Sequence, residues 1–159
     1  MKNLSKYISE KLIVNKGYED GRLRPTTRTQ LDDLIIKRVQ NSYKDYLDLT
    51  DIDVSKVSNF YKLFWEFEFK VIDISGWDTS HVKTMEDMFK SCDDLEDIIG
   101  IENFTFDNCV TISYIFAHCK KLNITKKIQD WKIDRNKTKI SAMLWDCPTD
   151  PPKCLRDIK

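Results

Sequence analysis

The hydrophobic positions of this chain recur at intervals of 25 to 28 residues. In residues 77–95, WDTSHVKTMEDMFKSCDDL, four apolar side chains fall at i, i+3, i+4 and i+7: Met85, Met88, Phe89 and Cys92. This spacing predicts the buried stripe of a short helix. The same slots are filled once upstream and twice downstream, by Phe60, Leu63, Phe64 and Phe67, then Ile112, Ile115, Phe116 and Cys119, and finally Ile140, Met143, Leu144 and Cys147. Four aligned stripes indicate stacked repeats.

More apolar columns precede the stripes. A large side chain lies eight or nine residues ahead of each stripe, at Ile52, Trp77, Phe104 and Trp131. Three residues earlier come Leu49, Ile74, Ile101 and Ile128. A third column predicts a short strand by period-2 alternation, and it comprises Leu47, Ile72 and Ile99, with Lys126 interrupting it in the last copy. The sequence therefore predicts an α/β fold, a short right-handed solenoid of about four strand–turn–helix units.

Residues 77–95 also resemble a known repeat. They are similar to the units of BspA-like leucine-rich-repeat proteins, W-D-[TV]-S-x-V-T-x-M-x-x-M-F-x-x-[CA]-x-x-L. Residues 52–64, IDVSKVSNFYKLF, match a second time, whereas the copies that begin at Phe104 and Trp131 match only in their apolar slots. The resemblance covers residues 47–147. It implies a leucine-rich-repeat-like solenoid that binds other molecules and has no active site, in a family whose members are often secreted or attached to the cell surface.

The segments on either side are expected to close the ends of the solenoid. We predict a helical N-terminal cap over residues 1–46, the solenoid over residues 47–147 and a C-terminal tail over residues 148–159. Within the cap, residues 4–12 carry a weak helical stripe and residues 29–43 a clear one. The candidate N-caps of the second helix are Thr26, Thr27 and Thr29.

Composition indicates a folded protein of one domain. The chain has 159 residues, of which 33% are charged and 11% aromatic. Charges interrupt the N-terminal segment MKNLSKYISEKLIVNK, so it does not read as a signal peptide. The sequence has no apolar run of 18 residues that could span a membrane. We therefore expect a cytoplasmic protein with no membrane association.

The cysteines allow two interpretations. Cys92, Cys119 and Cys147 share one column and are expected to pack as small core residues of a reduced protein. A zinc site is the alternative, because His118 adjoins Cys119. Adjacent side chains on a helix point apart, and the spacing of a zinc motif is missing. We expect no metal and no cofactor.

Charge is distributed unevenly along the sequence. Residues 47–98 carry 13 acidic and 5 basic side chains, a net charge of −8, and the segments before and after carry +4 each. This acidic centre is either a solvated face or a surface that docks on a basic partner. We expect no direct binding of nucleic acid there, since phosphates would be repelled. The basic residues of 120–139 lack the interleaved aromatic side chains of a nucleic-acid-binding surface.

The sequence offers no catalytic constellation. Its glycines are dispersed, so no phosphate-binding loop is present. His81 and His118 fall in different repeats, and no serine or cysteine lies in a nucleophile elbow. We therefore predict that the chain is not an enzyme.

Aromatic and acidic residues outside the columns remain as candidates for partner binding. Trp65 adjoins the first stripe, and Trp145 occupies the same place beside the last. Each is interpreted either as an interface anchor or as a residue that packs at the edge of a short helix. The full set of partner-binding candidates is Trp65, Glu66, Glu68, Phe69, Asp93, Asp94, Phe106, Tyr114 and Trp145.

The function predicted from the sequence is a non-enzymatic protein-binding repeat module. One hypothesis is a small phage or mobile-element inhibitor of an intracellular host protein such as a nucleic-acid-guided nuclease, an anti-CRISPR-like role. The alternative is a fragment of a bacterial surface adhesin of the BspA-like type. A protein partner is expected in both cases, and the sequence leaves the oligomeric state open.

Overall fold

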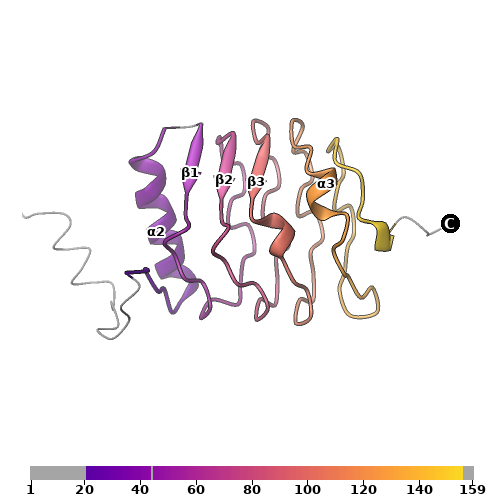
Figure 1. Ribbon diagram of the computed structural model, residues 1–159, viewed down its shortest axis with the longest axis horizontal. Helices are drawn as coiled ribbons and strands as arrows, with labels where there is room; N and C mark the ends of the chain where they lie inside the picture. Colours follow the sequence, from indigo (N-terminus) through magenta and orange to yellow (C-terminus); the bar gives the residue numbers. More distant parts are fainter. Residues whose placement is uncertain (1–20, 44, 156–159) are drawn as a thin grey trace, which may run out of the picture.

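The computed structural model describes residues 21–43 and 45–155. Its elements follow one another along the long axis in chain order, with α2 at one end and α3 towards the other (Figure 1). The helices and strands are α2 (Arg28–Gln40), β1 (Tyr46–Asp48), β2 (Val71–Asp73), β3 (Asp97–Ile99), the 3-10 helix η1 (Ile101–Asn103), α3 (Thr125–Ile128) and the 3-10 helix η2 (Lys153–Leu155).

The strands form a small parallel sheet of three strands in the order β1-β2-β3. Leu47 pairs with Ile72 and Ile72 with Ile98, and all three side chains are buried. The sequence pattern assigned the last place of this column to Ile99, which is one residue too late. Where the repeats differ in length, alternation alone does not determine the register.

Across the core from the sheet lie four segments that we call turn rows. The first comprises residues 59–67, the second 84–92, the third 111–119 and the fourth 139–147, and parallel bridges link each row to the next. In each of the first three rows, alternate N–H groups donate to carbonyls of the following row. Phe60 donates to Thr84 at 2.9 Å, for example, and Phe64 donates to Met88 at 2.8 Å. Twelve such bonds join the four rows, and all of them point the same way.

The prediction of helices in these segments is wrong. Each row is a chain of overlapping turns: the N–H of Met88 donates to the carbonyl of Met85, and the N–H of Cys92 to that of Phe89. Two residues per row have positive φ, and an α-helix cannot continue through left-handed residues. These residues are Lys62, Glu66, Asp87, Ser91, Tyr114, His118, Ala142 and Asp146.

The predicted α/β solenoid of about four strand–turn–helix units is therefore contradicted. In the described part of the chain the sheet has only three strands, and α2 and α3 are the only α-helices. The short helix α3 occupies the place where a fourth strand was expected, around Lys126. The apolar stripes are nevertheless largely buried, because overlapping turns with left-handed residues every fourth position also turn i, i+3, i+4 and i+7 inward.

The predicted helix over residues 29–43 is confirmed as α2, although it ends three residues earlier. Thr27 is its N-cap, and the Thr27 hydroxyl accepts from the N–H of Gln30 at 3.2 Å. Leu31, Leu34 and Ile35 are buried in the core. The weaker helix predicted over residues 4–12 lies outside the described residues.

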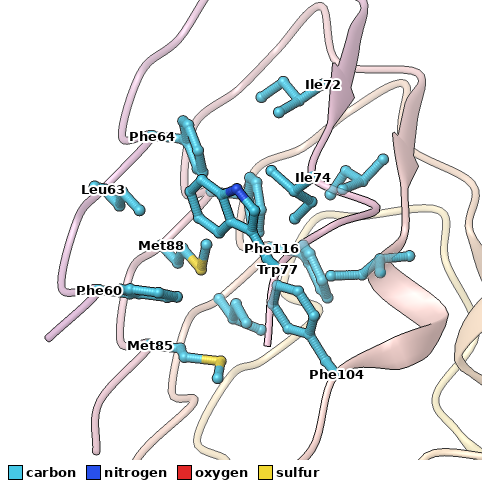
Figure 2. Packing of buried hydrophobic residues seen from close by; sticks show 14 of the residues in the cluster. Phe60, Leu63, Phe64, Ile72, Ile74, Trp77, Met85, Met88, Phe104 and Phe116 are labelled. Carbon is cyan, nitrogen blue, oxygen red and sulfur yellow. The ribbon is translucent and has the colours of Figure 1, made fainter. Parts of the chain in front are cut away.

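Aromatic side chains stack along the core in step with the rows. The ring of Phe64 lies 5.1 Å from that of Phe89, which lies 5.6 Å from Phe116. Trp77 fills the space between the turn rows and the strands (Figure 2). Its indole N–H donates to the carbonyl of Leu49 at 3.1 Å, and Trp131 donates in the same way to Ile101 at 3.0 Å. Each carbonyl also accepts a backbone N–H, so a tryptophan in this column adds a second donor as well as packing, which phenylalanine or isoleucine cannot do.

We predict opposite effects of glycine at two adjacent exposed positions of the fourth row. Ala142 has a φ of 49°, and Ser141 is not among the positive-φ residues. Ala142→Gly should raise the free energy of unfolding by about 0.5–1 kcal/mol because it relieves a left-handed alanine. Ser141→Gly should lower it by about the same amount through chain entropy. Urea denaturation measures both, and a loss of stability in both variants would contradict the left-handed geometry.

Gly100 should be far less tolerant of alanine than Gly21. Both glycines have positive φ, but a Cβ on Gly100 would lie 2.7 Å from the nitrogen of Ser75, and one on Gly21 would meet nothing within 4 Å. Gly21→Ala should cost about 1 kcal/mol of stability through backbone strain alone. Gly100→Ala should cost about 3 kcal/mol or more, because it adds a clash with the neighbouring backbone. Thermal unfolding of the two variants tests the difference, and equal losses would contradict this packing.

Candidate functional site, the aromatic turn face

The outward side of the turn rows carries exposed aromatic side chains beside cationic ones. Tyr61 is 43% exposed, Trp65 41% and Trp145 60%, and Tyr114 is half-buried. We call this surface the aromatic turn face and define it by its outward-facing side chains, which are Tyr61, Lys62, Trp65, Lys90, Tyr114, His118 and Trp145.

Lysine ammonium groups and a histidine ring pack against the aromatic rings of this face. The Lys62 ammonium lies 4.2 Å from the centre of the Trp65 ring, and Lys90 lies 5.0 Å from that of Tyr114 in the next row. Such cation–π contacts contribute roughly 0.5–1 kcal/mol each at exposed sites. The His118 ring lies 4.9 Å from that of Trp145. The backbone ladder beneath them is continuous, so the rings project from a fixed support.

Of the residues predicted from the sequence, Trp65, Tyr114 and Trp145 lie on this face. Glu66 and Glu68 are exposed beside Trp65. Phe69 and Phe106 are each only 4% exposed and belong to the core. The Phe106 ring packs against Trp131 at 4.8 Å, so neither phenylalanine is available to a partner.

Sequence reasoning missed four members of the face, which are Tyr61, Lys62, Lys90 and His118. The signal that could have found them is their alignment with known candidates at the repeat interval. Lys90 occupies the slot of Trp65 in the second row, and Tyr114 occupies the slot of Lys62 in the third. Only the stacking of rows brings a cation of one row against an aromatic ring of the next.

Five of the 13 acidic side chains of residues 47–98 form ion pairs with basic side chains outside that segment. Asp93 and Asp94 pair with Lys120 and Lys121 at 3.1 Å and 2.6 Å, one repeat further along. Three more ion pairs join acidic residues of this segment to basic residues outside it: Asp97 with Lys127, Asp53 with Arg24 and Asp51 with Arg38. The strongly negative segment therefore lies against its positive flanks, which offset part of its charge.

Tyr46 and Asp73 form a short hydrogen bond across the sheet. The Tyr46 hydroxyl donates to the Asp73 carboxylate at 2.6 Å. This bond, together with burial, raises the pKa of Tyr46 to about 12. Burial acts to raise the pKa of Asp73, but hydrogen bonds from Tyr46 and Ser75 outweigh it, so that pKa is lowered.

The column cysteines donate to backbone carbonyls. The thiol of Cys92 lies 2.9 Å from the carbonyl of Phe64, and that of Cys119 lies 2.9 Å from Phe89. A hydrogen bond with Cys92 and burial both raise the pKa of Cys119, which keeps its thiol protonated. The His118 ring instead contacts Asp146, at 3.1 Å. Between residues 21 and 155, Lys44 aside, no group of three or more His, Cys, Asp or Glu side chains is arranged to hold a metal ion.

A cleft of about 700 Å³ lies between α2 and β1. Leu23, Leu34 and Ile52 form its apolar wall. Two of its polar side chains already bind elsewhere, since Arg38 donates to Asp51 and Tyr46 donates to Asp73. The cleft lacks the convergent, unpaired polar groups that a small-molecule site needs, so the aromatic turn face is the stronger candidate.

Comparison with known proteins identifies a family for this architecture. Residues 35–151 match the family described as "Mycoplasma protein of unknown function, DUF285". The chain belongs to the DUF285 family. The family match spans the sheet, all four turn rows and the aromatic turn face. No curated protein and no solved structure matches the chain. Among the helices described for this DUF285 chain, none has the length and apolarity to cross a bilayer.

The Tyr46–Asp73 bond predicts a pH-dependent effect of Tyr46→Phe. At pH 7 the variant should lose about 1 kcal/mol, because the bond is charge-assisted but partly exposed. The lowered pKa of Asp73 makes its contribution present above about pH 4 and lost as pH falls further. The raised pKa of Tyr46 makes the contribution decline between about pH 10 and 12.

The matched control is Tyr61→Phe, because the Tyr61 hydroxyl has no hydrogen-bond partner among the described residues. Urea denaturation of both variants and the wild type from pH 3 to 11 measures the effect. A Tyr46→Phe deficit that does not shrink below about pH 4 would contradict the assignment.

Proposed function

We propose that the chain is a non-enzymatic protein-binding module that contacts its partner through the aromatic turn face. The observation that carries this proposal is the set of exposed aromatic rings fixed by neighbouring cations on a hydrogen-bonded support. Tyrosine and tryptophan dominate the energetics of protein interfaces. Rings that are already held in place lose little conformational entropy on binding. The proposed role involves no chemistry on the partner.

We further propose that this DUF285 chain is related to BspA-like leucine-rich-repeat proteins. The motif of residues 77–95 supports this relation because its positions have separate physical roles. Trp77 satisfies the carbonyl of Leu49, and the Asp78 carboxylate accepts from the N–H of Ser80 at 2.9 Å. Met85, Met88 and Phe89 fill the core, and the Cys92 thiol binds the preceding row. Such a motif specifies a framework and leaves the outward positions free to vary for recognition.

Of the two narrower roles suggested by the sequence, we favour recognition of the adhesin type over inhibition of a nuclease. The nuclease hypothesis rested on the size of the chain, its expected location and an acidic surface that docks on a basic partner. Asp93, Asp94 and Asp97 instead pair with lysines of the same chain. The adhesin hypothesis requires an exposed recognition surface with aromatic anchors, which the aromatic turn face supplies.

Photo-cross-linking in cells tests the proposed face. A photoreactive amino acid at position 62, between Tyr61 and Trp65, should capture one partner protein that mass spectrometry identifies. The double variant Trp65→Ser and Tyr114→Ser should reduce this cross-link about tenfold or more, as for removal of interface anchors.

The control uses an exposed aromatic residue away from the face. Tyr43 is 91% exposed beside α2. A cross-linker at position 43 should not yield this partner, and Tyr43→Ser should leave capture from position 62 unchanged. Equal capture from both positions, or none from position 62, would contradict the proposal.

A further inference from the structure

In the described part of the chain, the ladder between turn rows ends in a row of N–H groups without acceptors. Each bond runs from an N–H of one row to a carbonyl of the next, and no described row follows the fourth. Among the described residues no group accepts from the N–H of Ile140, Ala142, Leu144 or Asp146. Residues 149–153 do not cover them, because Thr149 and Lys153 bind near Leu122 and Gln129 instead.

The opposite end presents the matching acceptors. In the later rows, the accepting carbonyls lie at four fixed slots. The first row fills these slots with Asn59, Tyr61, Leu63 and Trp65. Arg28 of α2 donates to the first two, at 3.3 Å and 2.6 Å. No described residue donates to the carbonyls of Leu63 and Trp65. The two ends of the ladder therefore differ in polarity, and half of the acceptor end has no donor from residues 21–43 or 45–155.

The fourth row also leaves the apolar core incompletely covered. Ile140 and Leu144 are half-buried. Their counterparts in the earlier rows are fully buried, and these are Phe60, Phe64, Met85, Phe89, Ile112 and Phe116. Burying the exposed parts of the Ile140 and Leu144 side chains would be favourable by about 25 cal/mol per Å² of apolar surface.

Exposed tryptophans occur at both ends of one column of the face. This column contains Trp65, Lys90, Ala117 and Trp145, in row order. The interior positions are lysine and alanine, and the tryptophans occupy the first and last rows, where an end-to-end junction would form. If a second molecule continued the ladder, Trp145 of one copy would lie beside Trp65 of the next.

We propose that copies of this chain associate head to tail, with the fourth turn row of one copy docking on the first turn row of the next. Continuing the observed bonding pattern, the N–H groups of Leu144 and Asp146 donate to the carbonyls of Leu63 and Trp65 in the next copy. Two fourth rows cannot pair with each other because both present only donors, which excludes a symmetric dimer through this end. The proposal concerns the ends of the stack and does not rest on the partner proposed for the aromatic turn face, although Trp65 and Trp145 belong to both surfaces.

The junction should be weak and sensitive to salt. Arg28 and α2 keep half of the first row covered, so only part of each row is available. Asp146 and Glu66 would meet as like charges, since they occupy the same slot at opposite ends of their column. Asp146→Lys, which reverses that contact, should therefore strengthen association at low salt.

Sedimentation equilibrium from about 10 µM to 1 mM tests the proposal, a range suited to a small interface. The average mass of the full chain should rise steadily with concentration above the 18.8 kDa monomer. Trp145→Ser and Trp65→Ser should each weaken association about tenfold. Mixed together they should form dimers and no longer species, because one supplies the intact fourth row and the other the intact first row.

Two outcomes would overturn the proposal: a monomer throughout this range, or a closed dimer that neither tryptophan variant affects. Tyr114→Ser is the control, since this residue lies in an interior row and should leave self-association unchanged. The cross-linked product from position 62 tests for the partner protein, and sedimentation tests for self-association. The failure of one proposal can therefore be distinguished from the failure of the other.

Discussion

Every main feature of this structure depends on the one-directional backbone bonds between turn rows. Donating alternate N–H groups to the next row sets the spacing of the rows, and that spacing brings Phe64, Phe89 and Phe116 into a stack. This bonding pattern also requires left-handed residues. A chain that turns every few residues can direct its alternate N–H groups along the stack only if some of its residues have positive φ. The cost of those residues is offset by bonds that would otherwise be missing in a buried backbone.

The same constraint explains which parts of the fold could be predicted. The columns of apolar residues were visible because they reflect burial, and burial is the same whether a segment is a helix or a series of turns. What distinguishes the two is where the N–H groups go, within the segment or to the next row, and side-chain periodicity carries no information on that. The left-handed positions could not be predicted from the sequence either, since residues such as Lys62, Tyr114 and Ala142 are not the glycines that usually occupy such positions.

Charge shows a similar limit. The acidic centre and its basic flanks are separate segments of the sequence, which suggested separate surfaces with separate partners. Stacking brings residues about one repeat apart into contact, so Asp94 meets Lys121 and Asp97 meets Lys127. For the same reason, only some of the aromatic candidates are exposed. Trp65 and Trp145 lie on the outward side of their rows, whereas Phe69 and Phe106 lie in connecting segments that turn inward. Placing each of these residues on the surface or in the core requires knowing how the chain runs between the columns.

The polarity of the ladder gives the two ends of the molecule different chemistry. Aligned peptide dipoles leave partial negative charge on the open carbonyls of the first row and partial positive charge on the open N–H groups of the fourth. A guanidinium is the natural complement of the first end, and Arg28 at the start of α2 occupies that place. The fourth row has no equivalent anion or carbonyl from the described chain, although its backbone donors are as strongly oriented. An architecture of this kind is completed either by a dedicated cap or by another molecule, and here one end has the cap and the other has an exposed tryptophan beside its unused donors.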